Sequence, residues 1–184
     1  MALGSTIHKA AITLSDIDRG VYCDLQQTLA RHPSETPERL VARLLAYALC
    51  YQEGLLFTKG ICDGDAPDIW LKDENDRIAH WIEVGLPTPE RITTACKKAL
   101  KVTIFLYGKH ADRWQQMHQQ QLQGLERLTL IELPEELLHQ AVNDLQRSIN
   151  WSLTVTEGQI YLTTDRQDLE GQLLRVNENW LSVN

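Results

Sequence analysis

Apolar and polar residues alternate along the chain between Val21 and Leu29, so that nearly every second side chain is apolar. A period of two is typical of a β-strand with one buried face. The preceding residues 15–20, Ser-Asp-Ile-Asp-Arg-Gly, are rich in turn formers. We therefore expect residues 6–14 to be the partner strand of an N-terminal hairpin.

Helical periodicity replaces this alternation after Thr36. Thr36 is a residue type that caps helices, and Pro37 fits the first position of a helix. Apolar residues then recur at spacings of three and four as far as Leu49. The pattern predicts a helix that begins at Pro37 and ends near Gly54.

The rest of the chain consists of short apolar runs and amphipathic segments. Residues 73–76 are turn formers between two such runs, which predicts a second hairpin made of residues 68–72 and 77–84. The later segments predict a helix at 90–100, a strand at 102–107, a helix at 112–123, a strand at 128–132, a helix at 135–148, and strands at 151–155 and 159–163.

Together these elements predict an α/β (mixed α+β) fold. Helices would flank a mixed β-sheet, and antiparallel hairpins would be added at the N- and C-terminal ends. The sequence contains neither an internal repeat nor a linker rich in Pro, Gly or Ser. We therefore expect residues 1–184 to form a single domain.

The charge of the chain excludes some classes of function. Its 18 Lys and Arg residues against 25 Asp and Glu residues give a net charge of −7. Proteins that bind duplexes tightly and without sequence preference usually carry a basic excess, so an architectural role on DNA is not expected. An enzyme that contacts nucleic acid locally is still compatible with this charge, because a site for a divalent metal must itself be acidic.

The cellular location follows from what the sequence lacks. We find no apolar run of about 20 residues that would span a membrane, and no basic and then apolar start of the kind that directs secretion. The four cysteines are scattered at spacings that suit neither a zinc site nor a disulfide framework. These features predict a cytoplasmic protein without membrane association.

Three acidic residues are candidates for a metal site. Glu83 lies inside an apolar run, where a carboxylate is costly to bury unless it is paired or bound to a metal. Across the predicted hairpin, the carboxylates of Asp68 and Glu83 can converge at one end of the sheet, because facing side chains there are about 5 Å apart. Glu38, in the first turn of the first helix, is a third candidate. With the backbone carbonyl of Val84, these oxygens would suit Mg²⁺ or Mn²⁺.

Each acid also has a plainer interpretation. Glu38 could simply favour the positive end of the helix dipole. Asp68 could be a turn residue, and Glu83 could be a buried ion-pair partner of Arg39 or Arg91.

The order of these residues resembles the PD-(D/E)XK nuclease superfamily: Glu38 on a helix, Pro67-Asp68 on a strand, and Glu83 on the next strand. The chain as a whole is similar to the YaeQ family of bacterial proteins, which are described as carrying a variation on the PD-(D/E)XK core. The segments that carry this similarity are 29–36, Glu38-Arg39, 57–60, 81–87 and 90–92. The resemblance implies a restriction-endonuclease-like core and a divalent-metal-dependent nuclease that hydrolyses phosphodiesters.

The nuclease pattern has a lysine two residues after the second acid, and this chain departs from it there. Gly85 occupies that position. In the superfamily this lysine positions the attacking water and stabilises the developing charge. Arg91 and Lys98, seven residues apart on one predicted helix, are candidates to replace it, and Lys72 is another. We therefore keep two hypotheses, a nuclease that uses Asp68 and Glu83, and a non-catalytic protein that binds nucleic acid or a protein partner.

Overall fold

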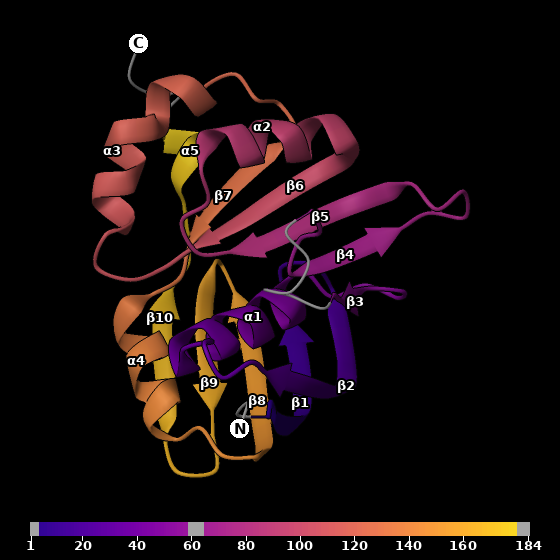
Figure 1. Cartoon of the computed structure of the whole chain (residues 1–184). Helices are drawn as coiled ribbons and strands as arrows, with labels where there is room; N and C mark the ends of the chain where they lie inside the picture. The colour runs from indigo at the N-terminus through magenta and orange to yellow at the C-terminus, as the bar shows by residue number, and fades with distance from the viewer. Residues whose placement is uncertain (1–3, 59–64, 180–184) are drawn as a thin grey trace. The chain divides into compact units, whose positions relative to one another are not determined.

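The computed structural model describes residues 4–58 and 65–179, and its contacts group the chain into two compact units. The first unit comprises Met1–Leu49 and Pro134–Leu173, and the second comprises Cys50–Leu133 and Leu174–Asn184. Figure 1 shows the chain from its N-terminus in indigo to its C-terminus in yellow. Residues 59–60 of the segment 57–60, which supports the family resemblance, lie outside the described residues.

The first unit contains a mixed five-stranded sheet in the order β10-β9-β8-β1-β2. Strands β1 and β2 form the predicted N-terminal hairpin, and β8 and β9 form the predicted C-terminal one. The two hairpins are joined into one sheet because β1 and β8 pair in parallel. The strands are β1 (Thr6–Asp16), β2 (Val21–Arg31), β8 (Ser148–Thr156), β9 (Gln159–Thr163) and β10 (Asp168–Gln172).

Two helices belong to the first unit, α1 (Pro37–Leu49) and α4 (Glu135–Asn143). Every residue of α1 from Leu40 to Leu49 is buried, so this helix has no exposed face beyond its first turn. The predicted start of α1 at Pro37 is confirmed. The prediction that the later helix extends to residue 148 is wrong, since β8 begins there and pairs with β1.

The second unit contains a mixed six-stranded sheet in the order β11-β7-β6-β5-β4-β3. Strands β5, β6 and β7 are parallel, and β4 joins β5 in the predicted antiparallel hairpin. The strands are β3 (Leu56–Phe57), β4 (Ile69–Lys72), β5 (Ile78–Val84), β6 (Ala99–Leu106), β7 (Leu128–Glu132) and β11 (Leu174–Arg175).

Three helices accompany this sheet, α2 (Pro89–Lys98), α3 (Ala111–Leu122) and α5 (Val176–Asn179). In Figure 1, α2 runs along the strands β5 and β6. One hydrophobic cluster joins the sheet to α2 and α3, and it includes Trp81 of β5, Ile92 of α2 and Trp114 of α3. None of the helices in the described part of the chain is both long and apolar enough to span a membrane.

The ends of two strands in the second unit bring the predicted acids together. Ile69 of β4 faces Ile82 of β5, and the same antiparallel register continued by one residue places Asp68 opposite Glu83. Residues that face each other in such a pair project to the same side of the sheet. After β5 the chain turns at Gly85 and enters α2, whose first residues therefore lie at this same end of the sheet.

Candidate functional site

Glu83 is the centre of the candidate site. It lies on β5 one residue before the end of the strand, and only 9% of its surface is exposed. Its Oε1 atom lies 2.5 Å from Nε of Arg91, and its Oε2 atom accepts a hydrogen bond of 3.0 Å from the indole N–H of Trp81. Both oxygens of this buried carboxylate are therefore held by donors from the second unit.

Arg91 connects three parts of the site. Besides its ion pair with Glu83, its Nη2 donates to the carbonyl oxygen of Ala66 at 2.9 Å. Its guanidinium carbon lies 5.8 Å from the centre of the Trp81 ring, within the range of a cation–π contact. Thr88 caps the helix by accepting from the backbone N–H of Arg91, so the first turn of α2 fixes where this side chain begins.

This geometry identifies which of the two predicted arginines pairs with Glu83. The ion pair predicted as one alternative is present, and Arg91 is the partner. Arg39, the other partner that we considered, instead forms an ion pair with Glu35 in the first unit. An ion pair does not by itself exclude a functional role, because paired carboxylates and cations also occur in active sites.

Asp68 is buried more deeply, with 3% of its surface exposed. It lies one residue before β4, and its Oδ2 accepts a hydrogen bond of 2.9 Å from the backbone N–H of Val84. Its own carbonyl oxygen accepts from the N–H of Thr58 at 3.0 Å. Just before β4 begins, the Asp68 carboxylate thus accepts the backbone N–H of Val84 on β5, as a strand carbonyl would do within the sheet.

The Val84 carbonyl lies on the same edge of β5. In an extended strand, the N–H and C=O of one residue point to the same neighbouring strand. The N–H of Gly85 donates to Phe105 of β6, whereas that of Val84 donates to Asp68. The carbonyl oxygen of Val84 therefore faces the side on which Asp68 lies.

Glu38 and Lys98 are the remaining candidates. Glu38 is half-buried in the first turn of α1 and belongs to the first unit. Lys98 is exposed at the last residue of α2. The next residue pairs with Ile78, and Glu83 lies five residues further along β5, about 16 Å at 3.3 Å per residue. Lys98 and Glu83 are thus at opposite ends of the strand.

Lys72, the third candidate for the missing lysine, is engaged in the turn of the hairpin. Its Nζ lies 2.8 Å from Oδ1 of Asp76 and 4.5 Å from the centre of the Trp70 ring. The adjacent Asp73 accepts two backbone N–H groups and pairs with Arg77. The hydrogen bond from the Arg77 N–H is the main reason that the pKa of Asp73 is lowered. Arg91 is therefore the one candidate of the three that contacts Glu83 in the described structure.

Gly85, where the sequence-based hypothesis looked for a lysine, has a backbone conformation that disfavours a side chain. Its φ angle is +112°, which side-chain-bearing residues rarely adopt. A Cβ atom built there would meet no atom within 4 Å, so backbone conformation and not space disfavours a side chain. A lysine at this position would require a different course of the chain between β5 and α2.

The donor set at this end of the sheet fits a hard divalent cation in kind. Carboxylate and carbonyl oxygens are the ligands that Mg²⁺ and Mn²⁺ prefer. Asp68, Glu83 and the carbonyl of Val84 provide such oxygens. Among residues 4–58 and 65–179, three or more His, Cys, Asp or Glu side chains do not gather in a group that could hold a metal. A cation here would therefore rest on two carboxylates and the backbone.

Trp81 and Ala66 were not predicted as parts of the candidate site. Trp81 could have been found, because residues two apart on a strand share a face and Trp81 precedes Glu83 by two. The carbonyl of Ala66 left no signal in the sequence, since any residue supplies a backbone oxygen.

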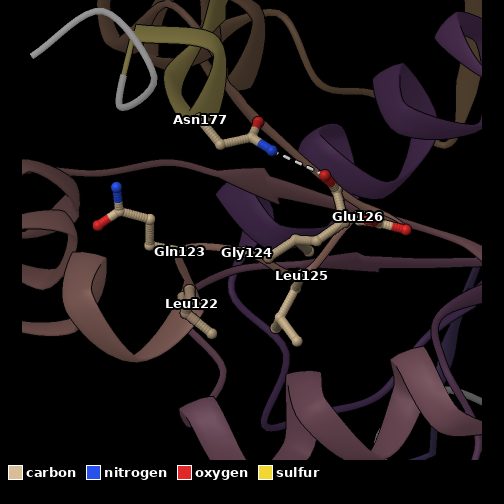
Figure 2. Close-up of a pocket in the computed structure, with 7 residues that line it drawn as sticks. Leu122, Gln123, Gly124, Leu125, Glu126 and Asn177 are labelled. Carbon is tan, nitrogen blue, oxygen red and sulfur yellow. Dashed lines mark hydrogen bonds between the residues drawn. The ribbon is translucent and has the colours of Figure 1, made fainter. Parts of the chain in front are cut away.

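A cavity of about 210 Å³ lies in a different part of the second unit. Figure 2 shows Asn177 of α5 across from the segment 122–126 that forms its wall. Asn177 is tied to β7, because its amide donates to the Leu128 carbonyl at 2.7 Å and accepts from the Leu130 N–H at 2.9 Å. The lining includes three leucines but none of the predicted site residues, so we assign the candidate chemistry to Asp68 and Glu83 instead.

Known proteins of one family are similar to this chain over most of its length. Residues 1–173 match the family model described as YaeQ protein. The chain is 39% identical over 174 residues to the uncharacterized protein YaeQ of Escherichia coli (strain K12), which covers 94% of this chain and 96% of that protein. It is 40% identical over 174 residues to the protein of the same description from Salmonella typhi, with the same coverage.

Two solved structures have the same fold. The crystal structure of YaeQ protein from Pseudomonas syringae matches with a TM-score of 0.88 at 39% identity, covering 92% of this chain and 94% of that one. The crystal structure of YaeQ protein from Xanthomonas axonopodis pv. citri matches with a TM-score of 0.89 at 31% identity, covering 92% and 97%.

Proposed function

The chain belongs to the YaeQ family, and we propose that it is a divalent-metal-dependent nuclease with a variant PD-(D/E)XK site. The observation that carries this proposal is the joint burial of Asp68 and Glu83 at one end of a sheet, with Arg91 bonded to Glu83. Two buried acids and a cation at strand ends are a costly arrangement that a purely structural role does not require.

The arrangement of elements supports a restriction-endonuclease-like core. Along the chain, α1 is followed by β3, β4 and β5, then by α2 and β6. The first three of these strands form an antiparallel meander, and β6 returns parallel to β5 after the crossover helix α2. Asp68 and Glu83 occupy the places in this order at which the superfamily pattern has its two acids.

In this proposal Asp68, Glu83 and the carbonyl of Val84 would hold Mg²⁺ or Mn²⁺. Such a bound ion polarises a phosphodiester and lowers the pKa of an attacking water. The role of the protein is to present oxygens at one edge of the sheet and to keep them in place. The hydrogen bond from Val84 fixes Asp68, and the donors Trp81 and Arg91 fix Glu83.

Arg91 would take the place of the motif lysine. A guanidinium is always protonated in proteins, so Arg91 would not accept a proton from water. It can instead stabilise negative charge that develops on a phosphate, for which its planar fork of donors is well suited. One-third of its side chain is exposed (32%), so it can reach a substrate beside Glu83.

A second candidate function is favoured by the same ion pair. Glu83 already has its charge compensated by Arg91, so this carboxylate can be buried without a metal. A family member that had lost hydrolysis could keep this arrangement for the stability of the sheet and bind nucleic acid or a protein partner. The net charge of −7 favours a protein partner over a long stretch of duplex in this case.

A cleavage assay distinguishes the two. Purified protein is incubated with Mn²⁺ or Mg²⁺ and a panel of single- and double-stranded DNA and RNA. We expect cleavage by the wild type, none by Asp68→Asn or Glu83→Gln, and a loss of about 10²–10³-fold for Arg91→Met. Lys97→Met is a matched control, because Lys97 is exposed on the same helix. Cleavage that persists in Glu83→Gln would point to a contaminant, and no cleavage of any substrate would favour the binding role.

A further inference from the structure

We infer that Trp81 is a positioning residue of this site, which sets the orientation of the Glu83 carboxylate and thereby the affinity for a divalent cation. The inference deepens the proposed function and rests on it. It assigns the tryptophan two separate contributions, a hydrogen bond from its indole N–H and a ring face beside Arg91.

The hydrogen bond has a geometry that packing determines. Trp81 and Glu83 are two residues apart on β5 and so project from the same face of the strand. Only 2% of Trp81 is exposed, and its ring belongs to the hydrophobic cluster that also contains Ile92 and Ala95 of α2. The core therefore fixes where the indole N–H lies, and Oε2 of Glu83 accepts its hydrogen bond at 3.0 Å.

The ring of Trp81 also contacts the other member of the ion pair. The Arg91 guanidinium carbon lies 5.8 Å from the ring centre while its Nε bonds Glu83. Trp81, Glu83 and Arg91 thus form a closed set of three mutual contacts. Displacement of any one of these side chains would therefore disrupt its contacts with both of the others.

The chemistry of this position requires tryptophan in particular. Phenylalanine would fill the core and keep a ring face for the guanidinium, but it has no N–H to donate. Donors that orient a carboxylate from behind usually change metal affinity or activity by about 10–100-fold when they are removed. We therefore expect Trp81→Phe to weaken cation binding by about that factor and to leave the fold intact.

Trp114 provides a matched control. It belongs to the same hydrophobic cluster, it is also buried (8% exposed), and its indole N–H also makes one hydrogen bond. That bond goes to the carbonyl of Pro87 at 3.1 Å and not to a candidate ligand. Trp114→Phe therefore reproduces the loss of an indole and its N–H without touching Glu83.

The first experiment measures the midpoint of thermal unfolding as a function of Mn²⁺ concentration. We expect Trp81→Phe to need about 10–100 times more Mn²⁺ than the wild type for half of the full shift, and Trp114→Phe to need the same concentration as the wild type. Equal responses of Trp81→Phe and the wild type would overturn the inference. An equal loss in both variants would also overturn it, because the effect would then be one of general core packing.

The second experiment needs no metal. The chain has five tryptophans, so a ¹⁵N-labelled sample is expected to give five indole N–H signals, of which Trp81→Phe identifies one by its loss. Glu83→Gln should move that signal more than the signal of Trp114, because its acceptor changes from a carboxylate to an amide. An unmoved signal would overturn the positioning contact itself. If Mn²⁺ has no effect on the wild type, the proposed function and the metal part of this inference both fail, while the indole signal still decides whether Trp81 orients Glu83.

Discussion

Replacement of Arg91 by methionine would leave Glu83 as a buried and unpaired carboxylate. Methionine matches the unbranched side chain of arginine as far as the position of Nε, but it carries neither a charge nor an N–H donor. The substitution removes the ion pair of 2.5 Å and the hydrogen bond of 2.9 Å to the carbonyl of Ala66. The effect on stability therefore reports the electrostatic role of Arg91 more than its packing.

The expected cost follows from the burial of the two partners. Removal of one member of a fully buried pair costs about 3–5 kcal/mol. The Glu83 side chain is 11% exposed but that of Arg91 is 32% exposed, so solvent screens part of the interaction. We therefore expect a loss of about 3 kcal/mol, which for a chain of this size lowers the melting temperature by roughly 6–12 °C.

The assay compares the urea and thermal unfolding of Arg91→Met with that of a control variant. Arg77→Met is the control, because Arg77 pairs with Asp73 at 2.8 Å but is 68% exposed, and an exposed pair contributes about 0–1 kcal/mol. The double variant Arg91→Met with Glu83→Gln should recover part of the loss, since the unpaired charge is then gone. If Arg91→Met costs no more than Arg77→Met, Glu83 is not the buried and dependent carboxylate that we describe.

Three further predictions concern the neighbourhood of the site. Asp68→Ala should lower the free energy of unfolding in urea by about 1–3 kcal/mol, because the buried N–H of Val84 loses its acceptor, and Asp68→Asn should cost less since it keeps an oxygen. Gly85→Ala should cost about 1–2 kcal/mol in the same assay although a Cβ atom has room, because φ is +112°. The lowered pKa of Asp73, held down chiefly by the Arg77 N–H, should stabilise the fold above the unfolded-state pKa of about 3.9. Melts of wild type and Asp73→Asn should therefore differ at neutral pH and converge as the pH falls through the lower folded-state pKa; a constant difference down to pH 2 would contradict this.

Much of the fold could be predicted because strands and helices with one buried face show a clear periodicity of apolar residues in the sequence. The alternation in β2, the cap and proline at the start of α1, and the turn formers before β5 each determine local structure directly. The parallel pairing of β1 with β8 could not be predicted, because it depends on contacts between segments about 140 residues apart in sequence. The strands β3 and β11 were also missed because two residues carry no periodicity, and β10 was missed because Leu169 is its one large apolar residue.

Two acids of the candidate site, Asp68 and Glu83, could be predicted from the same periodicity. Glu83 interrupts an apolar run, and the hairpin register then indicates Asp68 as its neighbour. Which cation accompanies Glu83 could not be decided from spacing, because Arg91 and Lys98 share one helical face. The direction of α2 determines that the partner is Arg91, since the helix begins at the Glu83 end of β5 and ends at the Ile78 end.

The central claim is that Asp68 and Glu83 form a site for a divalent cation. The most direct test is a thermal melt of the wild type and Glu83→Gln with and without millimolar Mn²⁺. A ligand at a hundred times its dissociation constant stabilises by about 2.7 kcal/mol, which corresponds to roughly 5–11 °C for a chain of this size. We predict a rise of this order for the wild type, no rise for Glu83→Gln, and a lower metal-free midpoint for the variant because its ion pair with Arg91 is lost. An unchanged wild-type midpoint, or an equal rise in both proteins, would contradict the claim.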